Sequence, residues 1–135
     1  MDAKTIQKYS KVSTPQLRIR AGEYFRKFIR LRDRELPCIC CGSWNTSDAG
    51  HYYSAGKHPE LEFNEDNVNL CCKKCNMHEH GNLIAYRKGL ERKIGQERLN
   101  TLDETADFWK RHTWKHDRFY LIGVIEEYKQ KIKAL

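Results

Sequence analysis

The 135-residue sequence lacks any run of about 18 apolar residues, and its mean hydropathy is −0.83, so a transmembrane helix is not expected. It also lacks the apolar segment of a secretory signal, because its N-terminus reads MDAKTIQKYSKVS. Internal repeats and low-complexity tracts are missing as well. We therefore expect a single domain with a modest core, in the cytoplasm and without a membrane partner.

Positive charge is in excess, since 25 Lys and Arg against 18 Asp and Glu give a net charge of +7 and a pI of about 9.1. A basic surface is typical of proteins that bind a polyanion. Residues 14–36 are expected to form a helix that begins at Thr14-Pro15, after a flexible tail over residues 1–13. One face of this helix carries a basic stripe, either solvated or in contact with phosphates: Arg18, Arg26, Arg30 and Arg34.

The C-terminal third is expected to be helical. A helix with an apolar stripe precedes Gly95, which is a plausible C-cap, and residues 96–135 form a helical arm. This arm carries a heptad-like seam, which is either a strap packed on its own domain (or a swapped arm) or a dimer interface. The seam consists of Leu121, Ile125, Tyr128, Ile132 and Leu135.

Six cysteines in a cytosolic chain favour a metal site over disulfides. Cys38 and Cys41 form one Cys-x-x-Cys pair, and Cys72 and Cys75 form a second. Each pair places two thiolates on one side of a tight turn, so that two such knuckles complete a tetrahedral structural Zn²⁺ site. The adjacent cysteines at positions 40 and 71 break this spacing, and we interpret them as incidental. The zinc is expected to clamp the segment between the knuckles.

The clamped segment reads as strand, loop, strand and then helix. HYYS, LEF and VNL are the expected strands, with GSWNTSDAG as loop. His51 would lie on the first strand, Asn67 at the foot of the second, and Asn76, His78 and His80 on the helix. A divalent metal at such a site stabilises a leaving oxyanion, and a neutral histidine opposite it deprotonates a water. Taken alone, His51 is best interpreted as a half-buried strand histidine.

This combination resembles the HNH, or ββα-metal, nuclease motif. AGHY looks like the first histidine of the motif, and NVNLCCKKCN like its middle asparagine followed by the start of the helix. The resemblance implies that His51 is the general base and that Asn67 ties the loop that holds the base. It further implies that Asn76 is a ligand of the catalytic metal.

The remaining ligands are less clear from the motif. Most HNH motifs have Asp or His immediately before the base, where this chain has Gly50. Asp48 is then the carboxylate candidate, provided that the strand bends. His80 lies one turn after Asn76 and is a further candidate, with His78 as the alternative, because a helix cannot point both at one metal.

A longer set of segments is similar to the NinG/Rap family of phage recombination endonucleases. It comprises FIRLRDRELPCICCGSW, DAGHY, LEFNEDNVNLCCKKCN and GNLIAYRKGLERKIGQERL, over roughly residues 20 to 102. The resemblance implies an α+β fold in which a zinc-knuckled, treble-clef-like HNH core over residues 37–95 is flanked by helices. It implies a phage enzyme that cuts branched DNA such as Holliday junctions in the bacterial host, with structural Zn²⁺ and catalytic Mg²⁺ or Mn²⁺.

Such an enzyme would grip backbone phosphates and act as a homodimer, since two strands are cut symmetrically. The alternatives are a non-catalytic zinc module that binds nucleic acid and an HNH nuclease for ordinary duplex DNA. The residues expected to contact DNA are Arg18, Arg26, Arg30, Arg34, Lys73, Lys74, Arg87 and Lys88.

Overall fold

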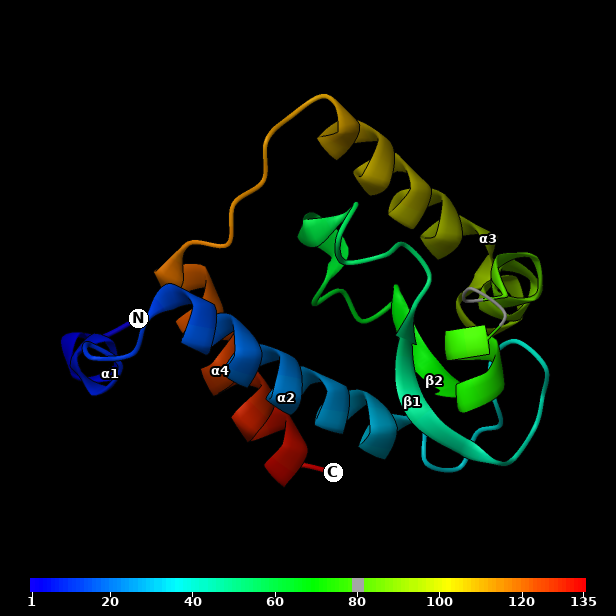
Figure 1. The fold of residues 1–135 in the computed structure, drawn as a ribbon, viewed down its shortest axis with the longest axis horizontal. Coiled ribbons are helices and arrows are strands. Elements are labelled where there is room, and N and C mark those ends of the chain that lie inside the picture. Colours follow the sequence, from blue (N-terminus) through cyan, green and yellow to red (C-terminus); the bar gives the residue numbers. More distant parts are fainter. Residues whose placement is uncertain (79–81) are drawn as a thin grey trace.

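The computed structural model describes residues 1–78 and 82–135 and has a mixed α+β fold. Two helices, α2 and α4, lie side by side, and a small sheet stands between them and α3 (Figure 1). None of the helices in these two ranges is long and apolar enough to cross a membrane. The elements in order are α1 (Ala3–Lys8), α2 (Thr14–Arg32), β1 (Thr46–His51), η1 (Pro59–Leu61), β2 (Val68–Cys72), η2 (Lys74–His78), α3 (Leu83–Lys110) and α4 (Arg118–Lys133).

Helix α2 begins at Thr14, and Ser13 is its N-cap. The Ser13 hydroxyl accepts a hydrogen bond from the Gln16 amide. Pro15 fits in the first turn, where its missing N–H would have no intrahelical partner. The helix ends at Arg32, earlier than the expected 36, with Asp33 as its C-cap. Its buried residues recur at helical spacing and face α4 and the sheet: Leu17, Ala21, Phe25, Phe28 and Ile29.

The C-terminal seam packs within its own chain. Leu121, Ile125 and Tyr128 are buried, and the Tyr128 ring meets Phe25 edge-on with ring centroids 4.9 Å apart. The two helices run side by side along much of their length (Figure 1). Of the two interpretations of the seam, the structure shows the first, in which the C-terminal helix is a strap packed on its own domain. Leu121, Ile125 and Tyr128 are covered in this way, whereas Leu135 at the end of the seam is 53 % exposed, and the homodimer stays a prediction.

The sheet has two antiparallel strands, with Gly50 opposite Asn69 and His51 opposite Val68. β2 is fully buried and includes the expected VNL strand. β1 covers TSDAGH, which was expected to be mostly loop, because its backbone is held by pairing with β2 rather than by apolar side chains of its own. LEF is not a strand, since Pro59 begins a short 3₁₀ turn that ends at Leu61.

Helix α3 contains a break at Gly95, whose φ of +83° lies in the left-handed region that favours glycine. The expected helix end and the second helix beyond it are thus both present. Leu99 and Leu102, after the break, join Leu90 in a core that also holds the cysteines. The expected boundary at residue 95 does not separate two cores.

The N-terminal segment differs from the flexible tail expected over residues 1–13. Ala3–Lys8 forms α1, with the Asp2 carboxylate accepting from the Thr5 amide. Tyr9 is 2 % exposed and its hydroxyl donates to Glu126 on α4 at 2.9 Å. A single aromatic residue in a polar stretch has no periodicity, so the sequence did not reveal this anchor.

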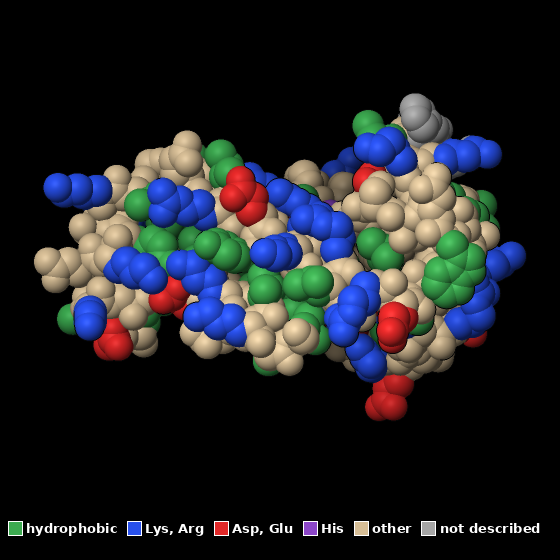
Figure 2. Space-filling model, turned by 90° about the horizontal axis from the view of Figure 1, so that it is seen from below, with side chains coloured by type: hydrophobic (Ala, Val, Ile, Leu, Met, Phe, Trp, Pro, Cys, Tyr) green, Lys and Arg blue, Asp and Glu red, His purple; other side chains and the backbone are tan. Residues whose placement is uncertain are grey.

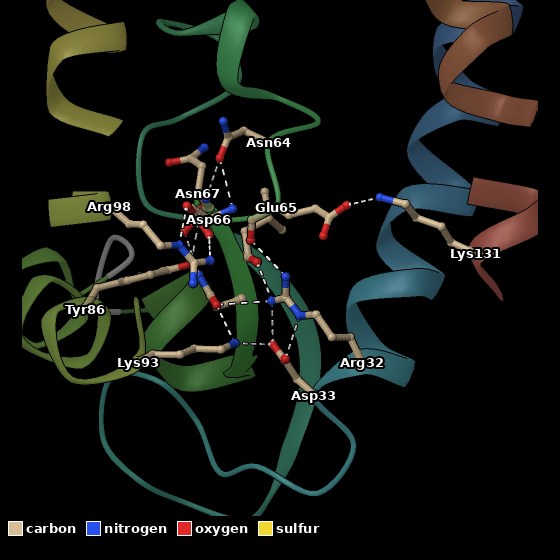
Figure 3. Close-up of polar contacts among 12 residues, drawn as sticks. Arg32, Asp33, Asn64, Glu65, Asp66, Asn67, Tyr86, Lys93, Arg98 and Lys131 are labelled. Carbon is tan, nitrogen blue, oxygen red and sulfur yellow. Dashed lines mark hydrogen bonds and ion pairs between the residues drawn. The ribbon is translucent and has the colours of Figure 1, made fainter. Parts of the chain in front are cut away.

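A buried polar network joins α2, β2 and α3 (Figure 3). Asp33 is 1 % exposed and accepts hydrogen bonds from Arg32 and from Lys93 Nζ, each at 2.8 Å. The Leu70 amide also donates to it. Burial by itself would raise the pKa of Asp33, but the hydrogen bonds from Arg32 and Lys93 lower it overall. The carboxylate is therefore charged and fully paired.

We expect Asp33→Ala to lower the free energy of unfolding by about 3 kcal/mol, because Lys93 and the Leu70 amide would lose their buried partner. Urea unfolding followed by circular dichroism measures this. The matched control is Asp107→Ala. The Asp107 side chain is 61 % exposed and pairs with Arg111, so its loss should lower the free energy of unfolding by less than about 0.5 kcal/mol. Equal losses for the two variants would contradict the role given to the network.

Candidate metal centre and catalytic site

Four cysteines from three segments meet at one point. Cys38 and Cys41 lie in the turn before β1, Cys72 ends β2, and Cys75 lies in η2. Their sulfur atoms all lie within 4.8 Å of one another, and the Cys41 and Cys72 sulfurs are 3.6 Å apart. A tetrahedral Zn²⁺ with Zn–S bonds of about 2.3 Å requires sulfurs roughly 3.8 Å apart. The four cysteines predicted from spacing are thus positioned to hold a metal ion.

The local backbone explains how each knuckle forms. The Gly42 amide donates to the Cys38 carbonyl at 3.0 Å, and Gly42 has a φ of +76°, which closes the first turn. In the second knuckle the Cys75 amide donates to the Cys72 sulfur. Burial alone would raise the pKa of Cys38, but hydrogen bonds from the Cys41 and Cys72 amides bring it to about 7. Burial raises the pKa of Cys75, so a bound cation would be needed to keep all four as thiolates.

Cys40 and Cys71 stand outside this group, as expected from their spacing. Both are buried in the apolar core beside α3. The pKa of Cys40 is raised well above its usual range. The main cause is a hydrogen bond with Cys71, and burial is the second. Cys40 is therefore a packed, protonated thiol, and both cysteines lie outside the group of four sulfurs.

His51, at the end of β1, is fixed through one ring nitrogen. Its Nε2 lies 2.9 Å from the backbone carbonyl of Glu62. Because a carbonyl can only accept, Nε2 carries the proton, and Nδ1 keeps a free lone pair. Burial lowers the pKa of His51, and this outweighs the opposing effect of the Glu62 carbonyl. The ring is therefore neutral at neutral pH, in the tautomer that a general base requires.

Glu62 itself is held by two side chains from distant segments. Its carboxylate receives the Arg18 guanidinium at 2.8 Å and His116 Nε2 at 2.9 Å. Glu62 is 9 % exposed, and these contacts lower its pKa although burial would raise it. Because the partners are 44 and 54 residues away, no local pattern could have revealed them. They fix the loop whose carbonyl orients His51.

Asn67 ties the two ends of the loop between the strands. Its side chain is fully buried and donates to the carbonyls of Tyr53 and Leu61, each at 3.0 Å. Its amide oxygen accepts from the Tyr53 backbone N–H at 2.8 Å. All polar atoms of the side chain are thus used within the loop.

Asp48 and Asn76 lie side by side, since Asn76 Nδ2 donates to an Asp48 carboxylate oxygen at 3.0 Å. The strand register shifts between Thr46 and Asp48, which supplies the bend that the sequence required. Burial would raise the pKa of Asp48, but hydrogen bonds from Asn76 and Ser47 lower it, with smaller effects of nearby cations. The carboxylate is therefore available as an anion.

Gly50, before His51, has no room for the carboxylate that the motif usually has there. A Cβ added to it would lie 2.8 Å from the Cys71 sulfur and 2.9 Å from the Asn76 amide oxygen. Asp48 lies two residues earlier, on the same face of β1 as Gly50. The candidate ligand His80 lies outside the described residues, and so does the side chain of its alternative, His78.

The expected DNA-binding residues fall into two groups. Arg18 and Arg87 are held by carboxylates, the latter by Asp103 at 2.7 Å. The others lie at the surface, with Arg26 half-buried: Arg26, Arg30, Arg34, Lys73, Lys74 and Lys88. Lysine and arginine predominate over acidic side chains on the face seen in Figure 2.

Two of the charges lie close to the candidate site. The positive charges of Lys73 and Arg30 both lower the pKa of Asp48. A groove of about 610 Å³, lined by Arg18, Arg26 and Glu62 among others, lies beside the loop that orients His51. The arrangement joins a neutral imidazole, a carboxylate and several cations around one hairpin, and these are groups suited to phosphoryl chemistry.

Comparison with known proteins identifies similar chains in phages. The family model described as "NinG: Bacteriophage Lambda NinG protein" matches residues 3–135. "Protein ninG" of Escherichia phage lambda is 43 % identical over 117 residues, which cover 85 % of this chain and 55 % of that protein. "Protein ninG" of Salmonella phage P22 is 41 % identical, with the same coverage. The chain thus spans about half the length of these curated relatives, and no solved structure matches it.

Proposed function

Because the chain belongs to the NinG family of phage proteins, we propose that it is a metal-dependent endonuclease for branched DNA. Its substrates would be phosphodiesters at recombination intermediates such as Holliday junctions and D-loops. The observation that carries the proposal is His51, kept neutral by burial and oriented by the Glu62 carbonyl so that Nδ1 is unprotonated, on a hairpin that ends in four clustered cysteines. A module that only binds nucleic acid has no need of such a histidine.

The hairpin and the turn after it are consistent with a ββα-metal core. β1 and β2 would supply the two strands, and η2 the start of the helix that carries Asn76. Four thiolates in tetrahedral reach favour Zn²⁺ in the structural site. Asp48 and Asn76 offer a carboxylate and an amide oxygen, which are the donors that Mg²⁺ and Mn²⁺ prefer.

In the proposed reaction His51 Nδ1 accepts a proton from a water as that water attacks the scissile phosphorus. Asp48 and Asn76 would hold the divalent ion, with the Asn76 amide turned so that its oxygen faces the ion. When bound, that ion supplies charge stabilisation at the leaving oxygen. Lys73 and Arg30 would contact flanking phosphates, and contacts of this kind read DNA shape rather than sequence.

A resolvase must cut two strands placed symmetrically, so a homodimer remains part of the proposal. Its two-fold contact has to use a surface other than the seam of α4, because Leu121 and Ile125 are buried against α2. The proposed dimer therefore leaves the helical pair intact.

The pH dependence of cleavage should follow His51. Its pKa is lowered below the usual 6.5, and the base works in its neutral form. We therefore expect kcat/KM to rise with pH through that lowered pKa and to be flat above about pH 7. Rates measured from pH 5 to 8 at saturating metal test this, with a second metal as the control. A rise centred well above pH 6.5 with both metals would contradict the assignment.

The decisive experiment is cleavage of a labelled four-way junction and of a linear duplex of the same sequence. We expect the junction to be cut in Mg²⁺ or Mn²⁺, the linear duplex to be cut far more slowly, and neither to be cut in buffer without divalent ions. Junction binding without cleavage would instead favour the non-catalytic zinc module. Equal cleavage of both substrates would favour a nuclease for ordinary duplex DNA.

A further inference from the structure

The end of α3, the connection after it and the first turn of α4 are rich in aromatic and cationic residues. Residues 108–120 read FWKRHTWKHDRFY, and they hold four Lys or Arg residues against one Asp. The connection runs from the end of α3 to the start of α4 as the orange segment of Figure 1. Neither the metal centre nor the proposed chemistry uses these residues, except for His116, which binds Glu62.

The inner part of this segment is an anchor. Trp114 Nε1 donates to His116 Nδ1 at 3.1 Å, and the His116 ring stacks on Tyr120. His116 and Tyr120 both lie against Phe63, which belongs to the main core. The connection is thus fixed to the domain at one side rather than free.

The outer part presents flat aromatic surface. The rings of Phe108 and His112 are stacked with centroids 4.0 Å apart and planes 9° from parallel. Phe108 is 46 % exposed, and His112 is also exposed. Trp109 packs edge-on against both Phe108 and Trp114, so the stack is held in place before any ligand arrives.

The charge around this stack favours a polyanion. Lys110 and Lys115 are exposed on either side of His112. The nearby carboxylate of Asp107 lies 3.3 Å from Arg111, and Asp117 caps α4 through the Tyr120 amide. These two carboxylates are therefore already engaged, while Lys110 and Lys115 are exposed.

We infer that the Phe108–His112 stack and the lysines beside it bind unpaired nucleobases of single-stranded DNA. A base can continue a stack of parallel rings whatever its identity, while the cations follow its phosphates. This rests on the proposed function, because a branched recombination intermediate is where single strands would reach the enzyme. The same connection contacts Glu62 through His116, so a strand bound here lies on the segment that braces the loop orienting His51.

The test is binding of a 15-nucleotide oligo(dT) in buffer without divalent ions, compared with an abasic strand of equal length. Binding is followed by tryptophan fluorescence in a Trp44→Phe background, where Trp109 and Trp114 are the reporters. We expect oligo(dT) to bind about tenfold more tightly than the abasic strand. Phe108→Ala should abolish that preference, whereas Phe108→Trp should retain it. The control is Phe119→Ala, which removes an aromatic ring of 53 % exposure outside the stack and should change nothing.

Equal binding of the two strands by the unsubstituted protein would overturn the inference, and so would a Phe108→Ala variant that still prefers oligo(dT). Thermal unfolding of each variant checks that the fold is retained. Because no cleavage is measured, the result is independent of the nuclease proposal. A protein that prefers oligo(dT) but cuts no junction would support this inference and contradict the proposed function.

Discussion

His51→Ala is expected to reduce the rate of junction cleavage by about 10²–10⁴-fold in the presence of Mg²⁺ or Mn²⁺. Loss of the imidazole removes the group proposed to deprotonate the attacking water. Asp48, Asn76 and the basic surface would remain, so junction binding should change little. Single-turnover cleavage together with an electrophoretic binding assay separates these two effects.

The matched control is His58→Ala, in the loop between the two strands. His58 packs edge-on against Tyr53 and pairs with Glu60, so it resembles His51 in burial but has no place in the proposed reaction. Its removal should change the cleavage rate by less than about threefold when the rates are compared at equal concentrations of folded protein. If the His51 variant folds, binds junctions and cuts at the wild-type rate, the proposed mechanism is wrong.

Cys38→Ser should release the metal and abolish cooperative unfolding of the hairpin region. A structural zinc in a small module contributes on the order of 10 kcal/mol, which is comparable with the whole stability of a typical domain. Three thiolates would remain without the fourth, and once the metal leaves, the turn before β1 is no longer tied to β2 through it. Native mass spectrometry gives the metal content, and calorimetry gives the unfolding transition.

Cys40→Ser is the control for this experiment, because Cys40 is buried two residues away but lies outside the group of four sulfurs. It should destabilise the core moderately while retaining about one metal ion per chain. A Cys38→Ser protein that has lost its metal but keeps a full thermal transition would contradict the structural role of the site.

The parts of the fold that were predictable depend on short-range patterns. Two Cys-x-x-Cys pairs identified all four clustered cysteines, because a knuckle is a local turn. Gly95 marked the break in α3, since only glycine tolerates that backbone conformation readily. The apolar spacing of Leu121 and Ile125 identified a buried face, although it could not say which surface would cover that face.

The parts that were missed depend on residues far apart in the chain. β1 is a polar segment that becomes a strand only by pairing with β2. Glu62 is contacted by Arg18 from α2 and by His116 from the connection between α3 and α4, and no local sequence pattern links these residues. Asp33 and Lys93, 60 residues apart, form a buried ion pair for the same reason. The chemistry of single residues could be predicted from the sequence, whereas the residues that they contact are determined by the tertiary fold.

The packing of α2 against α4 also has a consequence for the order of folding. Tyr9 and Glu126, which hold the N-terminal segment to α4, are 117 residues apart, so closing this contact carries a large loop entropy. The metal cluster closes a much shorter loop, and its residues leave the ribosome well before α4 does. We therefore expect the metal-bound hairpin to form first during synthesis, and α2 to wait with its apolar face uncovered until α4 arrives.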